Sequence, residues 1–354
     1  MAEPAGRVLP LPWQHAAWTA LQARAAERLP HALLLTGEPG IGKRRFADAF
    51  AAWLLCDTPQ STSLPSACGR CKSCLLAAAG THPDLLVVVP EAMRASEDGE
   101  GDGKKKKPSR EIRVDDVRAL IGFAAQTAQF GGRRVVVIEP AQAMNVNAAN
   151  ALLKTLEEPG EGTVLLLVCD QPAALTATIR SRCQSLPLPS PTRQQAQAWL
   201  AAELGGDSAR ATALLAAAGT PTRALALADA DDWVVQRRSL APLLVDVLTG
   251  EVSAVRFAEQ AAKAPEALLL DWLPSLLVDA VRLAEGVPAE RLRNADLAKE
   301  LRRLVEARAT QPLFLLGDDL ARLRQQLNAN TGLSRPLLWE EVMLRWSPRS
   351  RGGR

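Results

Sequence analysis

The sequence lacks the long, uncharged apolar run of roughly 18 or more residues that a helix needs to cross a bilayer. Residues 264–281 come nearest to such a run. Glu266, Asp271 and Asp279 interrupt them, which indicates an amphipathic or buried helix instead. We therefore expect no membrane-spanning segment.

The sequence also lacks a large excess of charge of either sign. Its 42 Lys and Arg residues nearly balance 39 Asp and Glu residues, giving a net charge of +3 over 354 residues. This balance argues against a protein that coats nucleic acid over its whole surface, although a local basic patch stays open. Residues 1–13 contain no basic segment followed by an apolar core, so we expect no secretion signal and a cytoplasmic protein with reduced thiols.

A third absence lies within a phosphate-binding loop. The segment GEPGIGKR follows the pattern of Gly, four residues, Gly-Lys and then Ser or Thr, except that Arg44 replaces the final hydroxyl residue. In this pattern Gly37, Gly40 and Gly42 let backbone N–H groups surround phosphate oxygens, and Lys43 adds a positive charge. The missing hydroxyl normally binds Mg²⁺, which Arg44 would repel. The loop therefore predicts a nucleotide fold but argues against catalysis at this site.

The residues on both sides of the loop fit a phosphate site. Residues 31–36 form an apolar run typical of a buried strand, and residues 43–55 repeat apolar side chains at helical spacing. Strand, loop and helix come in the order that a phosphate site needs. The alternative is a Gly-Pro turn that joins strand and helix and binds nothing.

Four of the six cysteines, Cys56, Cys68, Cys71 and Cys74, follow the spacing C-x11-C-x2-C-x2-C. Each C-x2-C places two thiolates on one tight turn, and four thiolates complete a tetrahedral Zn²⁺ site with no open position. The alternatives are a redox pair or four free thiols. We predict one structural zinc ion in the segment 56–74.

Short apolar runs at residues 85–89, 134–138, 163–168 and 184–188 alternate with helical patterns. This alternation predicts an α/β fold with a mostly parallel sheet. Residues 91–110 break the pattern, because they are acidic and Gly-rich at first and then carry a run of lysines. They predict a flexible surface insert, and contact of the lysines with nucleic acid is the alternative.

A proline-rich segment, residues 187–191, follows the last of these runs and predicts a stiff linker. Beyond the linker nearly every pattern is helical. Residues 192–228 predict two or three short helices, and residues 232–346 predict longer amphipathic helices.

Two further segments carry a family resemblance. Residues 147–159, NAANALLKTLEEP, follow the third strand, and residues 178–183, TIRSRC, come shortly after the next one. With these segments the chain resembles the clamp-loader branch of the AAA+ ATPases. The cysteine segment after the first helix, and residues 80–84, GTHPD, narrow the resemblance to the bacterial DNA polymerase III delta-prime family and its relative, the tau/gamma family.

The resemblance implies three regions. Residues 1–187 would form an α/β P-loop AAA+ domain with a parallel sheet, containing the zinc insert 56–74 and the flexible insert 91–110. Residues 188–230 would form a small helical lid, and residues 231–354 an all-α collar domain for oligomerisation. The match in the collar rests on length and helicity only.

Departures from the family pattern concern catalysis. Active members carry Asp-Glu at the end of the third strand, where Asp orders Mg²⁺ and Glu polarises the attacking water. This chain has Glu139 and Pro140 there, and Cys169-Asp170 where active relatives sense the γ-phosphate with Thr or Asn. Phosphoryl transfer needs a positioned metal and a positioned water. Together with Arg44, these residues imply a subunit that does not hydrolyse ATP, as in the delta-prime type.

Two arginines keep positions to which the family gives a role. Arg182 matches the arginine of Ser-Arg-Cys, which reaches into the ATP site of a neighbouring subunit; a helix-capping arginine is the alternative. Arg223, in GTPTR, matches the second sensor arginine, which contacts nucleotide from the lid. The presence of Arg223 and the glycine-lysine loop leaves Mg²⁺-independent binding of ATP or ADP open.

The resemblance thus implies a delta-prime subunit of the DNA polymerase III clamp loader. It would assemble with tau/gamma and delta subunits and help to load the sliding clamp onto primed DNA during DNA replication. We expect no independent catalysis, although the subunit would belong to a holoenzyme that is a DNA-directed DNA polymerase, a nucleotidyltransferase. An active tau/gamma-like ATPase and a zinc-dependent DNA-binding module are the rivals. An ATPase assay and the salt dependence of DNA binding separate them.

Overall fold

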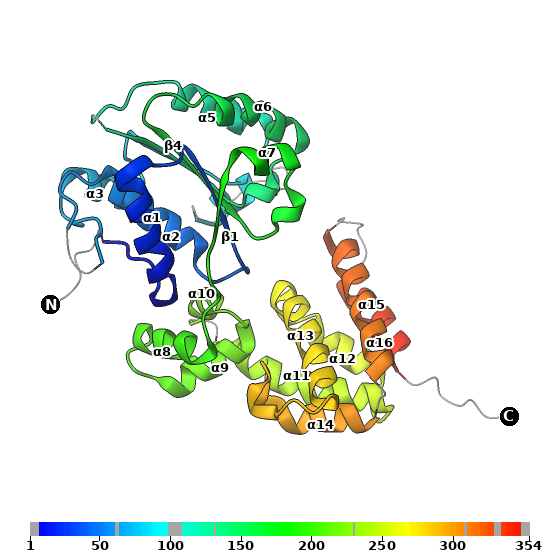
Figure 1. Cartoon of the computed structure of the whole chain (residues 1–354). Coiled ribbons are helices and arrows are strands. Elements are labelled where there is room, and N and C mark those ends of the chain that lie inside the picture. The colour runs from blue at the N-terminus through cyan, green and yellow to red at the C-terminus, as the bar shows by residue number, and fades with distance from the viewer. Residues whose placement is uncertain are drawn as a thin grey trace. The chain divides into compact units, whose positions relative to one another are not determined.

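The chain folds into two compact units, Met1–Gln195 and Ala196–Arg354, which are described separately below (Figure 1). The computed structural model describes residues 7–60, 64–97, 108–130, 132–228, 231–307, 310–328 and 334–347. Within this part of the chain, none of the helices combines the length and apolar character that crossing a bilayer requires.

A five-stranded sheet forms the centre of the first unit (Figure 1). Its spatial order is β2-β3-β4-β1-β5, and every neighbouring pair is parallel. The strands are β1 (Ala32–Thr36), β2 (Leu85–Val88), β3 (Arg134–Ile138), β4 (Thr163–Cys169) and β5 (Gln184–Pro187). All five predicted strands are therefore confirmed, with ends that differ by at most one residue.

Helices cover both faces of the sheet, as the predicted α/β class requires. The helices of this unit are α1 (His15–Arg28), α2 (Lys43–Leu55), α3 (Lys72–Ala78), α4 (Glu91–Glu97), α5 (Val114–Ala124), α6 (Val146–Glu157) and α7 (Ala177–Arg182). Leu33 and Leu35 of β1 pack in the core with α1 and α2, while Leu34 packs on the opposite face with α5, α6 and α7. The alternation follows from the two-residue period of a strand.

The segment predicted as a flexible insert, residues 91–110, is partly helical instead. Glu91–Glu97 forms α4, and the Ala92 N–H donates to the carbonyl of Ser109 at 2.9 Å. Arg94 ties the helix to α5 through Asp116, with Nη2 and Oδ1 2.6 Å apart. The acidic composition near the start hid this short helix, which tertiary contacts hold in place. The flexibility of the insert stays a prediction. Residues 98–107, which include the lysine run, lie outside the described residues.

The described residues of the second unit form helices and turns, as predicted. These helices are α8 (Arg193–Glu203), α9 (Ser208–Ala218), α10 (Pro221–Ala226), α11 (Asp231–Thr249), α12 (Ala254–Ala261), α13 (Glu266–Ala284), α14 (Ala298–Ala307), α15 (Thr310–Asn328) and α16 (Arg335–Trp346). Helix α8 begins at the end of the first unit. The division into a lid (188–230) and a collar (231–354) stays a prediction.

A buried polar network joins α11 to α13 in the second unit. Trp272 Nε1 and Arg237 Nη1 donate to Oδ1 of Asn294 at 3.0 and 2.9 Å, and Asn294 Nδ2 donates to Asp279 at 2.8 Å. The bonds pair polar groups that would be costly to bury alone, so they hold the two helices in one arrangement.

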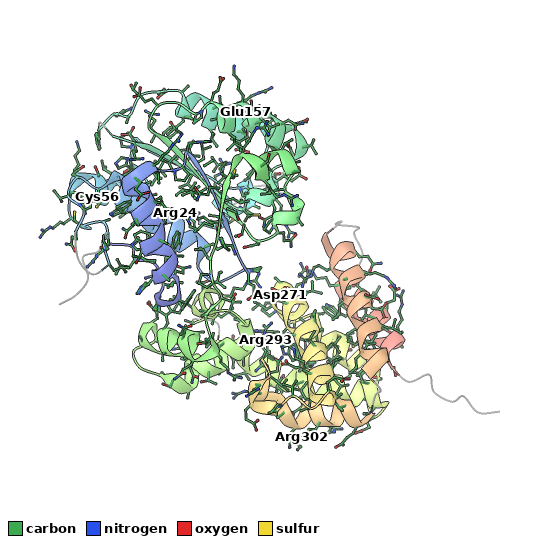
Figure 2. All side chains as sticks on the ribbon, viewed as in Figure 1. Arg24, Cys56, Glu157, Asp271, Arg293 and Arg302 are labelled. Atoms are coloured by element: carbon green, nitrogen blue, oxygen red, sulfur yellow. The ribbon has the colours of Figure 1, made fainter. Side chains whose placement is uncertain are left out.

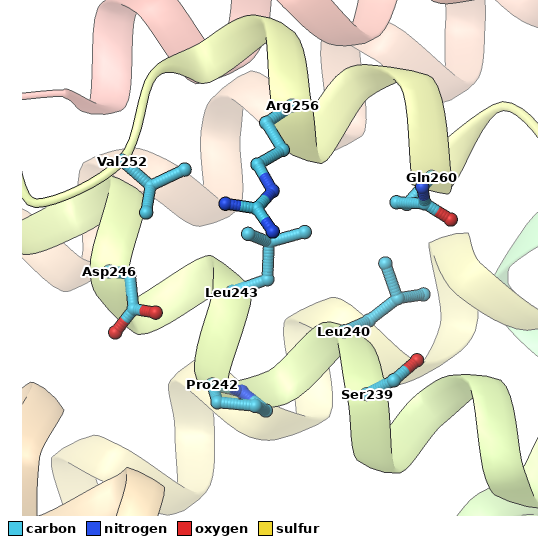
Figure 3. Close-up of a pocket in the computed structure, with 8 residues that line it drawn as sticks. All are labelled: Ser239, Leu240, Pro242, Leu243, Asp246, Val252, Arg256 and Gln260. Carbon is cyan, nitrogen blue, oxygen red and sulfur yellow. The ribbon is translucent and has the colours of Figure 1, made fainter.

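A surface pocket of about 340 Å³ lies between α11 and α12 (Figure 3). Asp246 and Arg256 line it together with the apolar side chains of Leu243 and Val252. Asp246 is already paired with Arg303 at 3.0 Å. We assign this pocket no function.

Candidate functional site

The loop between β1 and α2 has the backbone that the glycine pattern predicts. Gly40 and Gly42 have φ angles of 75° and 86°, in the left-handed region that favours glycine. A Cβ atom at Gly42 would also lie only 2.2 Å from Cδ1 of Leu11. Gly37, at φ 147°, leaves 2.7 Å between such an atom and Ile41. Conformation and space thus both require glycine here.

The segment before α1 packs against the loop. It forms a short 3-10 helix, Pro12–Gln14. Trp13 Nε1 donates to the carbonyl of Ile41 at 3.0 Å, and Gln14 Nε2 donates to the carbonyls of Ile41 and Gly42 at 3.0 and 3.1 Å. These hydrogen bonds hold the loop in place from within the chain.

The ammonium of Lys43 is neutralised by the chain itself. Its Nζ lies 2.6 Å from Oδ1 of Asp170, which directly follows β4. It also donates to the carbonyls of Gly37 and Glu38 at 2.8 and 2.5 Å. These three contacts match its three N–H donors, and the side chain is only 3% exposed. A phosphate that bound Lys43 would have to displace the carboxylate of Asp170.

Arg44, at the position of the missing hydroxyl, is bound by two carboxylates. Its Nε donates to both oxygens of Asp48 at 2.8 and 2.9 Å, and its Nη1 donates to Glu139 at 2.7 Å. Burial alone would lower the pKa of Arg44, but the charges of Asp48 and Glu139 raise it above its ordinary value. Burial raises the pKa of Glu139, and the contact with Arg44 opposes that shift.

A guanidinium therefore lies beside the carboxylate of Glu139. Glu139 directly follows β3, and its partner Arg44 is the second residue of α2. A divalent cation between these residues would meet the fixed positive charge of Arg44, which cannot be deprotonated in a protein. The arrangement fits an ion pair and not a metal site.

The four predicted zinc ligands come together beside α3 (Figure 2 labels Cys56). The Sγ atoms of Cys56 and Cys71, and those of Cys68 and Cys74, are each 3.9 Å apart. All four sulfurs lie within 4.8 Å of one another. Tetrahedral Zn²⁺ with Zn–S bonds of about 2.3 Å needs sulfurs about 3.8 Å apart, so the donor set fits this ion.

Backbone N–H groups point at these sulfurs. The N–H of Cys68 donates to Cys56 at 3.3 Å, that of Cys71 to Cys68 at 3.3 Å, and that of Cys74 to Cys71 at 3.4 Å. Burial raises the pKa of the Cys56 and Cys74 thiols. Burial acts in the same direction on Cys68, but hydrogen bonds from the backbone N–H groups of Arg70 and Cys71 help to lower the pKa of that thiol to about 6. Such donors stabilise thiolates, the form that binds metal.

Arg182 lies at the end of α7 and contacts Glu157 at the end of α6. Its Nε and Nη2 lie 2.8 and 2.5 Å from the same oxygen, Oε1 of Glu157, and its Nη1 donates to the carbonyl of Thr178 at 3.0 Å. About a third of the side chain, 34%, is exposed. The guanidinium is thus held at the surface instead of being buried in the core.

Two family models match this chain. One, described as DNA polymerase III, delta subunit, matches residues 13–192, and the other, described as DNA polymerase III, delta subunit, C terminal, matches residues 231–348. A protein named DNA polymerase III subunit delta' from Pseudomonas aeruginosa is 40% identical over 338 residues, which cover 95% of this chain and 97% of that protein. The chain belongs to the DNA polymerase III subunit delta' family.

Other members of the delta' family show the same breadth of similarity. The DNA polymerase III subunit delta' of Escherichia coli K12 is 34% identical over 321 residues, which cover 90% of each chain. That of Yersinia pestis is 35% identical over 342 residues, which cover 95% of this chain and 94% of the relative. The predicted family is therefore confirmed, and the parallel sheet with helices on both faces confirms the predicted α/β class.

Arg223 of this delta' family member lies in α10 of the second unit, where its Nη1 is 2.8 Å from Oδ2 of Asp271. Arg324 of α15 binds the other oxygen of Asp271, also at 2.8 Å (Figure 2 labels Asp271). A contact between Arg223 and nucleotide stays a prediction. The pairing with Asp271 gives Arg223 a structural role within its own unit.

Sequence reasoning missed that three carboxylates pair with the cations of these sites. Asp48 lies four residues after Arg44, so the helical spacing of opposite charges could have indicated that pair. Glu157 and Asp170 lie 25 and 127 residues from the cations they bind (Arg182 and Lys43), and only the packing of α6 on α7 and of β4 beside β1 brings them together.

Proposed function

We propose that this chain serves in the DNA polymerase III clamp loader, where it assembles with tau/gamma and delta subunits. In this function it helps to load the sliding clamp onto primed DNA during DNA replication, in the cytoplasm. The observation that carries the proposal is a contrast between two sites. In its own loop Lys43 is buried against Asp170 and Arg44 is bound by two carboxylates, whereas Arg182 has one carboxylate partner, Glu157, and lies at the end of a surface helix.

The chain's own site is proposed to be inactive in hydrolysis. The guanidinium of Arg44 binds Glu139 at 2.7 Å, and Pro140 provides no group that could activate water. Lys43 reaches phosphate only if Asp170 leaves. These contacts disfavour the rival function, an active tau/gamma-like ATPase. Binding of ATP or ADP without turnover would require displacement of Asp170.

Arg182 is proposed to act in trans on the ATP of a neighbouring subunit. An arginine supplied in this way accelerates hydrolysis by roughly 10³ to 10⁵ in other nucleotidases. The support is its place at the exposed end of α7, in a chain whose own catalytic groups are replaced. An arginine that served only its own site would have lost its task here.

The four cysteines are proposed to hold one structural Zn²⁺, which would pin the segment between α2 and α3. Four thiolates fill a tetrahedral site and leave no position for substrate. The small net charge of +3 disfavours the second rival, a zinc-dependent DNA-binding module that works alone.

The division of the second unit is also a proposal. We assign residues 188–230 to a lid and residues 231–354 to a collar through which the subunits assemble. The second family match supports this boundary, because it begins at residue 231.

The test of the trans role uses Arg182→Ala in the reconstituted complex. Arg180→Ala is the matched control, because Arg180 lies in the same helix and its Nη1 donates to the carbonyl of Pro172 at 3.1 Å. Assembly should stay intact in both variants. Arg182→Ala should lower ATP turnover and clamp loading in part, since only one site of the complex is affected. Rates equal to those of the unmodified complex would make Arg182 a structural residue.

A further inference from the structure

The contact between Arg182 and Glu157 uses one edge of the guanidinium. Nε and Nη2 both point to the same carboxylate oxygen, at 2.8 and 2.5 Å, and Nη1 binds the carbonyl of Thr178 at 3.0 Å. Three of the five N–H donors are therefore used within the chain. A side chain with four rotatable bonds is held in one orientation.

The two donors that these contacts leave belong to different nitrogens. One N–H of Nη1 and one N–H of Nη2 have no partner among the described residues. A guanidinium that offers one N–H from each of two nitrogens can bind a phosphate in bidentate fashion. The geometry thus keeps the phosphate-binding capacity of Arg182 while its other donors anchor it.

The place of Glu157 is not explained by the stability of its own helix. Glu157 is the last residue of α6 and is labelled in Figure 2. A negative charge at a helix C-terminus is unfavourable, because the exposed carbonyls there already carry partial negative charge. The next residue, Glu158, is also exposed but has no contact with Arg182. Glu157 therefore does not stabilise α6, and its contact in the structure is with the guanidinium of Arg182.

We propose that Glu157 is a positioning residue for Arg182. It holds the Nε–Nη2 edge, so that the remaining donors of Arg182 face the terminal phosphate of a nucleoside triphosphate bound by a neighbouring subunit. The inference rests on the proposed trans function of Arg182. Misplacement of a reacting group by about 1 Å costs on the order of 10²-fold in rate, so an arginine freed from its anchor should act poorly.

The experiment measures ATP turnover by the reconstituted complex with Glu157→Ala, Glu157→Gln or Glu158→Ala in this subunit. The Glu157 side chain is 50% exposed, so the loss of its ion pair with Arg182 should leave folding and assembly intact. Glu157→Ala should lower kcat at the site that Arg182 serves by about 10-fold or more, with KM for ATP unchanged. Glu157→Gln keeps an oxygen acceptor and should recover part of the rate, while Glu158→Ala should match the unmodified complex.

Arg182→Ala and the double variant complete the test. If Glu157 acts only through Arg182, Arg182→Ala and the double variant should give the same rate. A double variant slower than Arg182→Ala, or a Glu157→Ala variant as fast as Glu158→Ala, would overturn the positioning role. Normal turnover with Arg182→Ala would instead refute the trans function itself, so the two failures are distinguishable.

Discussion

Replacing Asp170 by Ala should both destabilise the first unit and open its loop to anions. The side chain of Lys43 is 3% exposed, and its ammonium would keep the carbonyls of Gly37 and Glu38 as partners. Hydrogen bonds to charged groups contribute about 1.5–3 kcal/mol. Because the Asp170 side chain is 34% exposed, we expect a loss of about 2 kcal/mol in the free energy of unfolding.

This loss can be measured as a shift in the melting temperature. For a unit of this size, one kcal/mol corresponds to roughly 2–4 °C, so the melting temperature of Asp170→Ala should fall by about 4–8 °C. ADP or pyrophosphate should then bind Lys43 and restore stability. A ligand at about 100 times its Kd adds about 2.7 kcal/mol, which is enough to offset the loss. Mg²⁺ should not be needed, because Arg44 already pairs with Glu139.

The assay is thermal unfolding with and without ADP, in the presence of a metal chelator weak enough to spare bound zinc. Asp115→Ala is the matched control, because Asp115 is 83% exposed and pairs with the nearby Arg118. Adding Lys43→Ala to Asp170→Ala should abolish the gain from ADP. The reasoning is refuted if ADP stabilises the unmodified chain as much as the variant, or if Asp170→Ala melts at the unmodified temperature.

The remaining predictions concern zinc and hydrolysis. Metal analysis should give close to one Zn²⁺ per chain, and Cys71→Ser should lower both metal content and melting temperature; a metal-free chain of unchanged stability would contradict the site. The isolated chain should hydrolyse no ATP above background, and Glu139→Asp with Pro140→Glu should not restore turnover, because Arg44 remains. Steady turnover that Lys43→Ala abolishes would show that the chain is an active ATPase.

The sequence predicted the central strands β1, β3 and β4 well because they are buried on both faces. Residues 134–138 form a continuous apolar run apart from Arg134, and β3 has these bounds. Lys43–Leu55 likewise became α2 as predicted, since its apolar side chains repeat on one face. Local pattern is sufficient where burial alone decides the structure.

Contacts between distant segments could not be predicted in the same way. The pairing of Lys43 with Asp170 depends on β4 lying beside β1. Local sequence patterns predict strands, but they do not predict the order of the strands in a parallel sheet. The packing of Trp13 and Gln14 against the loop depends on where the chain enters the sheet. The sequence offered one signal for the short helix itself, because Pro12 occupies its first position.

The internal ion pairs give a structural reason for a loop with the fold of a phosphate site in a chain whose residues for ATP hydrolysis are replaced. Lys43–Asp170 joins the start of α2 to the end of β4, and Arg44–Glu139 joins α2 to the end of β3. In an active relative, nucleotide and metal would supply those links and would leave after hydrolysis. Here the links are ion pairs within the chain, which hold this end of the sheet without a bound nucleotide. The trans role that we propose for Arg182 would gain from such permanence, because an arginine that acts in trans must be in position whenever its neighbour binds ATP.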